Sequence, residues 1–166
     1  MTKSEAVIGR ASANDLDGIV ELQAANQLER GGTLSASLPL SKITEMMRDM
    51  PLVVARCDGR IAGFLMTSAR ATNADVPIIS AMFAAYAGAA NAYVYGPICV
   101  VTEERGKGLA QAMFSELRRL APAREGILFI RRDNSASLRA HQKMGMDEVA
   151  SFVFGGNEFA VLNYLG

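Results

Sequence analysis

The sequence has no tryptophan, a single histidine and only two cysteines among its 166 residues. A structural zinc site usually takes four Cys or His ligands, and these three residues cannot supply them. Cys57 and Cys99 form no CxxC pair and no disulfide framework, which is typical of a protein of the reducing cytosol. The first residues contain no apolar core of signal-peptide length. We therefore expect a cytoplasmic protein that folds without metal or disulfides.

An excess of charge is lacking as well, since 17 Lys plus Arg balance 17 Asp plus Glu. A nucleic-acid partner usually requires a basic surplus, so we expect none. The most Ala-rich apolar stretch, 76–90, is shorter than the roughly 20 residues that span a bilayer. Half of the residues are hydrophobic, which is enough for a core. The length predicts one domain over residues 1–166.

Strand-like and helix-like patterns alternate along the chain, and this predicts an α/β fold of the α+β kind. A cap at Asn14 or Asp15 predicts the first helix, and an Asp-Gly pair at 58–59 predicts a hairpin turn. Asp75 and Pro77 could open another helix, with a strand interrupted by Gly96-Pro97 after it. We expect strands at 6–11, 52–56, 61–68, 92–101, 126–131, 146–154 and 158–164, and later helices at 41–50, 108–121 and 134–145.

A glycine-rich turn after the strand at 92–101 carries the strongest chemical signal. Gly106 and Gly108 open an amphipathic helix there. The first amides of a helix have no internal partners, and together with the helix dipole they favour a phosphate group. Glycine allows the left-handed conformations with which a backbone closes on such a ligand. Neither a Walker GxxxxGK[ST] motif nor a GxGxxG motif is present, so the turn predicts a phosphate site of another type.

Arg105, Gly108 and Ala110 fit the pattern [Q/R]-x-x-G-x-[G/A]. This segment resembles the acyl-coenzyme A pyrophosphate loop of the GCN5-related N-acetyltransferases (GNAT). The resemblance implies a single GNAT-like domain with a mixed, mostly antiparallel central sheet of six or seven strands. It also implies helices on both faces of the sheet and splayed strands at the cofactor cleft.

A second segment resembles a later element of the same family, in which an Asn opens a helix and a Tyr or His lies seven residues further on. Asn134, His141 and Gly145 match this spacing, and Met146 replaces the usual aromatic residue. Residues 8–22 resemble the family's first strand and helix, whereas residues 70–91 are covered worst.

The resemblance implies acetyl-CoA as the cofactor. Backbone groups of the strand would bind pantetheine, and the loop amides would bind the pyrophosphate. The implied cofactor-binding residues are Ile98, Cys99, Val100, Arg105, Gly106, Lys107, Gly108, Leu109, Ala110, Asn134 and Ser137.

Acyl transfer from a thioester to an amine needs proton movements at both the amine and the sulfur. His141 occupies the position at which the family usually has a Tyr facing the sulfur, so a neutral His141 could donate a proton; the alternative is that it only binds the cofactor or a neighbouring backbone group. The strand at 92–101 contains no carboxylate, which leaves the general base open. Tyr95 or Tyr93 could act through water, Glu29 is another candidate, and a water chain would need no named base.

We take His141 and Tyr95 as candidate catalytic residues and Glu29 and Tyr93 as candidate substrate-binding residues. Cys99 could be a nucleophile, but its apolar strand favours a buried core residue. The sequence thus predicts an acetyl-CoA-dependent N-acetyltransferase that acts on a small-molecule primary amine by direct transfer. A non-catalytic acyl-CoA-binding module and a protein N-terminal or lysine acetyltransferase are the alternatives. A homodimer through the last strands is compatible with the family.

Overall fold

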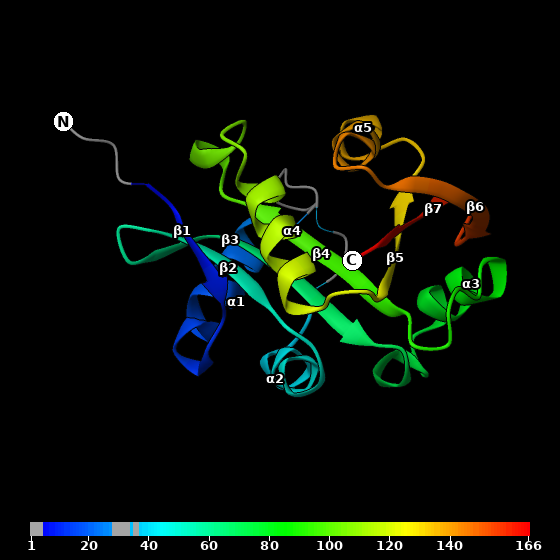
Figure 1. Ribbon diagram of the computed structural model, residues 1–166, viewed down its shortest axis with the longest axis horizontal. Coiled ribbons are helices and arrows are strands. Elements are labelled where there is room, and N and C mark those ends of the chain that lie inside the picture. The colour runs from blue at the N-terminus through cyan, green and yellow to red at the C-terminus, as the bar shows by residue number, and fades with distance from the viewer. Residues whose placement is uncertain (1–4, 28–33, 35–36) are drawn as a thin grey trace. The chain divides into compact units, whose positions relative to one another are not determined.

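The computed structural model describes residues 5–27, 34 and 37–166 of the chain. Its helices and strands alternate along the sequence (Figure 1). In chain order they are β1 Val7–Arg10, α1 Leu16–Ala25, α2 Leu40–Asp49, β2 Val53–Cys57, β3 Arg60–Ala69, α3 Pro77–Ala85, β4 Tyr93–Val100, α4 Leu109–Leu120, β5 Glu125–Arg131, α5 Ser135–Lys143, β6 Asp147–Phe154 and β7 Asn157–Leu165.

The strands form a seven-stranded sheet, which agrees with the six or seven strands expected, and their order is β1-β2-β3-β4-β5-β7-β6. The pairs β1–β2, β2–β3, β5–β7 and β6–β7 are antiparallel, and β4–β5 is parallel. The chain divides into two compact units, of which one comprises residues 1–67 and 96–121 and the other residues 68–95 and 122–166. We call them unit 1 and unit 2 and describe each by itself. The single domain expected from the sequence stays a prediction.

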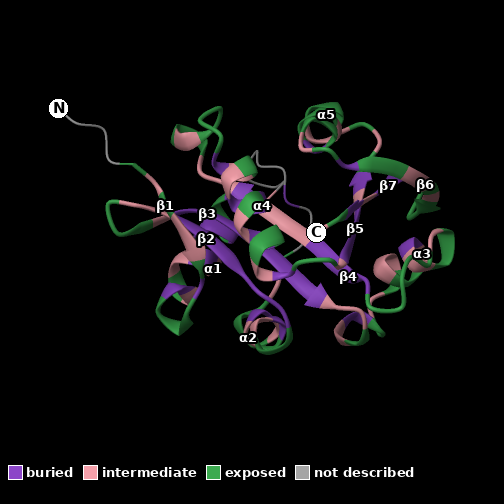
Figure 2. Cartoon of the chain, viewed as in Figure 1, coloured by how far each residue is buried: buried purple, intermediate pink, exposed green. Residues whose placement is uncertain are grey.

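In unit 1, α1 and α2 pack against one face of the β2–β3 hairpin, and β2 and β3 are largely buried (Figure 2). Ile19 and Ile43 from the helices meet Val54 and Phe64 of the hairpin in one core. Helix α4 covers the opposite face, where a Cβ at Gly63 would lie 3.1 Å from the Met113 methyl group. A glycine at this point of β3 therefore lets α4 approach the strand closely.

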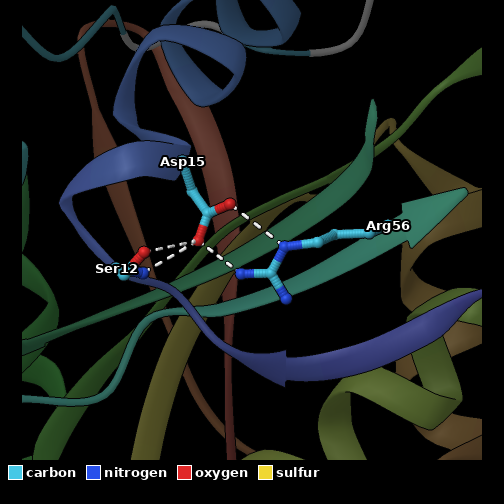
Figure 3. A network of polar contacts seen from close by, with 3 residues as sticks. All are labelled: Ser12, Asp15 and Arg56. Carbon is cyan, nitrogen blue, oxygen red and sulfur yellow. Dashed lines mark hydrogen bonds and ion pairs between the residues drawn. The ribbon is translucent and has the colours of Figure 1, made fainter. Parts of the chain in front are cut away.

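Three polar residues tie the start of α1 to β2 (Figure 3). The Asp15 carboxylate accepts the Ser12 amide at 2.8 Å. It also accepts two hydrogen bonds from the Arg56 guanidinium, of which that from Nε is 3.1 Å long. Burial by itself raises the pKa of Asp15, but the hydrogen bonds from Arg56 and Ser12 outweigh it and hold the pKa below the usual value. The carboxylate is thus ionised and paired.

In unit 2, β5 pairs with β7 along its whole length, from Glu125–Leu165 to Arg131–Phe159. Helix α3 covers one face of this ladder, with Met82 packed in a core with Val94, Ile127 and Val161. The opposite face carries a row of tyrosines. Gly126 lies opposite Tyr164, and a Cβ there would be 2.3 Å from the Tyr164 ring. Gly126 therefore makes room for that ring.

Residues 70–91, which the family resemblance covers worst, are held in unit 2 by the carboxylate of Glu125. It accepts the Ala89 amide at 2.6 Å, the Tyr86 hydroxyl at 2.8 Å and the Asn163 amide at 2.8 Å. Arg70 donates to the carbonyls of Ala87 and Ala89. These contacts join the segment after α3 to β5 and β7.

Three local expectations differ from the structure in whole or in part. Asp15 is the N-cap residue of α1, one of the two positions expected, but its side chain makes no capping hydrogen bond to α1, and a 3-10 turn at Ala13–Asp15 precedes the helix. Helix α3 begins at Pro77 as expected, but its N-cap is Val76 and not Asp75. Strand β4 continues through Gly96-Pro97, which is a cis peptide bond. Its recorded pairing with β5 nevertheless comprises only Tyr93–Gly126 and Val94–Ile127.

Candidate functional site

The glycine-rich loop in unit 1 has the backbone geometry that the sequence predicted. Gly106 has φ of 79° and Gly108 has φ of 80°, which is the left-handed region that favours glycine. Gly108 is the N-cap of α4, so the helix begins at Leu109 and not at Gly108. An added Cβ at either glycine would meet no atom within 4 Å. The glycines are thus needed for conformation and leave open space beside the backbone.

The amides at the start of α4 are the groups in this loop that are suited to bind an anion. The Ala112 amide donates to the carbonyl of the N-cap residue Gly108 at 3.0 Å. The preceding amides of a helix have no i−4 carbonyl to bond, and they lie at the positive end of the α4 dipole. Residues 106–110 therefore supply partial positive charge through the backbone.

The basic side chains of the loop are engaged with neighbouring protein groups. Arg105 donates from Nε to the Val100 carbonyl at 3.1 Å and from Nη2 to the Asn26 side chain at 2.9 Å. Asn26 in turn donates to the Leu22 carbonyl at 2.9 Å at the end of α1. Lys107 pairs with Glu104 at 3.1 Å. Arg105 thus braces the loop against the end of α1.

Asn26 is a functional candidate that the sequence reasoning missed. It lies 79 positions before Arg105 in the sequence, and a lone Asn at a helix end is an ordinary C-cap residue. No local pattern distinguishes it from any other cap. Only the tertiary structure brings it to the loop.

Cys99 lies in the hydrophobic core of unit 1 with 5% of its surface exposed. Burial raises the pKa of its thiol to about 11, a rise that nearby Arg105 only partly offsets. A thiol at that pKa is protonated at neutral pH and is a poor nucleophile. Its neighbours Ile98 and Val100 are half-buried.

His141 lies in unit 2 on α5, whose start is capped by Asn134. The Asn134 side chain accepts the Ser137 amide at 3.2 Å. His141 Nδ1 lies 2.8 Å from the Ser137 carbonyl and 3.3 Å from its hydroxyl. His141 is 5% exposed, and burial lowers the pKa of its imidazole below the usual value, although the hydrogen bond with Ser137 opposes this. The imidazole is therefore neutral at physiological pH.

Tyr95 and His141 are brought together across 46 residues of sequence. The Tyr95 hydroxyl lies 3.2 Å from His141 Nε2, and the two rings meet edge to face with centroids 5.5 Å apart. Tyr95 is 4% exposed, and burial raises the pKa of its hydroxyl far above the usual value, with a smaller contribution from Tyr93. The pair is thus a neutral phenol against a neutral imidazole.

The structure gives no further support to the two candidate substrate-binding residues, Tyr93 and Glu29. Tyr93 is fully buried, and its hydroxyl pairs with that of Tyr164, which is a packing arrangement. Glu29 lies outside the residues that the structure describes. Two arginines at the end of β5, which were not among these candidates, form ion pairs: Arg131 with Asp133 at 2.9 Å and Arg132 with Glu148 at 2.7 Å.

Among the described residues, no helix is long and apolar enough to cross a membrane. No group of three or more His, Cys, Asp or Glu side chains that could hold a metal ion is found within the same residues. The site candidates are therefore the loop at 105–110 with its Asn26 brace in unit 1, and the Tyr95–His141 pair with Ser137 and Asn134 in unit 2.

Comparisons with known proteins agree with this geometry. The model of the acetyltransferase (GNAT) family matches residues 16–146. An acetyltransferase of the GNAT family from Streptococcus agalactiae has 16% identity and a TM-score of 0.73, and the match covers 100% of this chain and 98% of that one. No curated protein matches the chain.

Two further solved structures share the fold. The ribosomal-protein-S18-alanine N-acetyltransferase from Escherichia coli has 12% identity and a TM-score of 0.68, with 97% of this chain and 94% of that one covered. A Salmonella typhimurium protein solved with its cofactor acetyl-CoA has 17% identity and a TM-score of 0.68, with 98% and 94% covered. At these identities the likeness concerns the fold.

Proposed function

Since the chain belongs to the acetyltransferase (GNAT) family, whose cofactor is acetyl-CoA, we propose that it transfers the acetyl group to the primary amine of a small molecule by direct transfer. The observation that carries the proposal is the loop before α4, in which two left-handed glycines with open space beside them lead into the first amides of the helix. A pyrophosphate is the part of the cofactor that such a loop suits.

The cofactor residues proposed here act mainly through the backbone. Amides of residues 106–110 would bind the pyrophosphate, and the half-buried Ile98 and Val100 would offer their peptide groups to pantetheine. Acetyl-CoA supplies an activated acyl thioester when bound. The chain has to orient that thioester and move one proton, since the buried Cys99 thiol is unsuited to form an acyl-enzyme.

The loop assignment is tested by replacing Gly108 with Ala. An L-residue with φ near 80° is strained by roughly 1–2 kcal/mol, and its methyl group would enter the open space beside the amides. We expect the Kd for acetyl-CoA, measured by calorimetry, to rise at least about tenfold, a loss of about 1.4 kcal/mol.

Gly156→Ala is the matched control, because Gly156 has φ of 79° and equally open surroundings in the β6–β7 turn. It carries the same strain away from the loop and should leave the Kd unchanged. Equal affinities for all three proteins would refute the loop assignment.

A second candidate is a non-catalytic acyl-CoA-binding module, and one observation favours it: β4, with the sequence YVYGPICV, has no carboxylate to act as a base. Release of free CoA thiol in the presence of a panel of primary amines separates the two. The panel should contain a polyamine, free amino acids, an aminoglycoside, and peptides with a free N-terminus or a lysine. Binding of acetyl-CoA without thiol release from any of them would leave the binding module. Acetylation of the peptides alone would identify a protein acetyltransferase.

A further inference from the structure

The side chain of Asn26, the C-cap residue of α1, has two partners in unit 1 that need opposite hydrogen-bond functions. Its Nδ2 donates to the Leu22 carbonyl at 2.9 Å, and its Oδ1 accepts from Nη2 of Arg105 at 2.9 Å. A carbonyl oxygen can only accept a hydrogen bond and a guanidinium can only donate one. The position therefore suits a short side chain that carries both a donor and an acceptor, which is the property of asparagine.

The main chain of Asn26 is held in place as well. Its amide donates to the Gln23 carbonyl at 3.2 Å, and its carbonyl accepts the Leu34 amide at 3.0 Å. Asn26 is 6% exposed, and its partners Leu22 and Leu34 belong to the hydrophobic core of unit 1. Asn26 is thus an anchor that α1 and the core hold in place independently of its bond to Arg105.

Arg105 connects this anchor to the glycine-rich loop through two nitrogens of its guanidinium. Nε donates to the Val100 carbonyl at 3.1 Å, and Nη2 donates to Asn26. The ion pair between Lys107 and Glu104 joins two neighbouring residues of the loop and is partly exposed on both sides, so it contributes little to the stability of the loop. The bonds of Arg105, by contrast, join the loop to the end of β4 and to the end of α1.

The conformation of this loop needs such support. Gly106 and Gly108 both have left-handed backbone angles, and glycine loses more conformational freedom than any other residue when its backbone is fixed. If a binding-competent conformation is only partly populated, the affinity for the ligand falls by the populated fraction. A brace at the residue directly before Gly106 raises that fraction, because it fixes one end of the loop before a ligand arrives.

Resting on the loop assignment in the proposed function, we propose that Asn26 is a positioning residue for the cofactor. Through the Arg105 guanidinium it holds the loop at 105–110 in the conformation that binds the pyrophosphate. Arg105 serves here by its shape, because its planar guanidinium reaches two acceptors in a fixed geometry. The other role open to Arg105 is a direct contact between its charge and a phosphate, and the two roles predict different results for Arg105→Lys.

Arg105→Lys separates these two roles. The substitution keeps the positive charge, but a single ammonium group cannot reproduce two bonds from separate nitrogens of a planar group. Arg105 is exposed, so the variant should keep its fold. We expect the Kd for acetyl-CoA, measured by calorimetry, to rise about tenfold, as it would if the competent fraction of the loop fell to about one-tenth. An unchanged Kd would overturn the positioning role and would favour a charge contact.

A double-mutant cycle tests whether Asn26 acts through Arg105. Asn26→Ala should raise the Kd for acetyl-CoA about tenfold in the wild-type protein and less than about twofold in an Arg105→Met background, because residues that share one contact are not additive. The same increase in both backgrounds would overturn the proposal. Acetyl-pantetheine carries the thioester without the pyrophosphate, so it should bind the wild-type protein and Asn26→Ala equally well. An equal loss of affinity for both ligands would indicate general damage and would also overturn the proposal.

Asn73→Ala in unit 2 is the matched control. Asn73 is 5% exposed, and its side chain donates to the carbonyl of Ala69, four residues earlier, at 2.9 Å and to the Ser68 hydroxyl at 2.8 Å. The substitution thus removes a buried amide with a similar set of bonds and should leave the Kd for acetyl-CoA unchanged. A rise equal to that of Asn26→Ala would contradict a specific role of Asn26.

The binding data also separate the failure of this proposal from the failure of the proposed function. If Gly108→Ala raises the Kd and the Asn26 and Arg105 variants do not, the positioning role alone is wrong. If Gly108→Ala leaves the Kd unchanged, the loop assignment is wrong and the positioning role falls with it. A wild-type protein that binds acetyl-CoA and acetylates no amine would overturn the proposed activity alone, because the role of Asn26 is measured by binding.

Discussion

Replacing Asp15 with Ala removes the link between the start of α1 and strand β2. The loss of the Ser12 amide bond resembles the loss of a helix cap, at about 1 kcal/mol. The two bonds from Arg56 are charge-assisted, but the Arg56 side chain is 29% exposed and regains water when its partner is removed. We therefore expect a total loss of about 2–3 kcal/mol in the free energy of unfolding.

Urea denaturation followed by circular dichroism measures this loss. Asp17→Ala is the matched control, because Asp17 lies in the first turn of α1 and is exposed. Its favourable interaction with the helix dipole is worth only about 0.3–1 kcal/mol. Arg56→Met supplies the other arm of a double-mutant cycle, since it keeps an apolar stem and removes the charge.

The pH dependence gives a second test of the same link. The folded-state pKa of Asp15 lies below its unfolded value, so its contribution is fully present above the unfolded pKa and is lost as the pH falls through the folded pKa. The difference between the wild-type protein and Asp15→Ala should therefore shrink from pH 5 towards pH 3. A difference that grows in this range, or one equal to that of Asp17→Ala, would contradict the reasoning.

Two further predictions concern unit 2. Glu125→Gln should lower the free energy of unfolding by about 1–3 kcal/mol and should speed hydrogen exchange at the Ala89 amide, because the new NH₂ group of Gln would face groups that donate hydrogen bonds to the carboxylate. Glu45→Gln is the control, because Glu45 is exposed. Equal effects of the two substitutions would contradict the conclusion that Glu125 holds the segment after α3. Since the pKa of Glu125 is lowered by its hydrogen bonds despite burial, this contribution too should disappear at acid pH. Gly126→Ala should cost at least about 1–3 kcal/mol in thermal or chemical unfolding, because its Cβ would lie 2.3 Å from Tyr164. Gly9→Ala on β1, where the nearest atom is 3.9 Å away, should be neutral, and a similar cost at both sites would rule out the steric explanation.

The sequence by itself determined the features that depend on neighbouring residues. Apolar periodicity predicted the helices and strands of the sheet within a few residues, because each element repeats its own spacing. The turn at Asp58-Gly59 and the left-handed glycines before α4 were predictable because only a few residue types adopt these conformations easily. The match of Arg105, Gly108 and Ala110 to a known loop predicted the family that the comparison confirmed.

Only the tertiary structure decided which distant side chains meet. Asp15 meets Arg56, Arg105 meets Asn26, and Tyr95 meets His141, over separations of 41, 79 and 46 residues. Such pairs depend on strand register and on how closely a helix approaches the sheet, and neither property is present in the spacing of one segment. The sequence could thus place a histidine near the expected chemistry. Its contact with the Tyr95 hydroxyl became recognisable only when α5 and β4 were seen to share one buried contact.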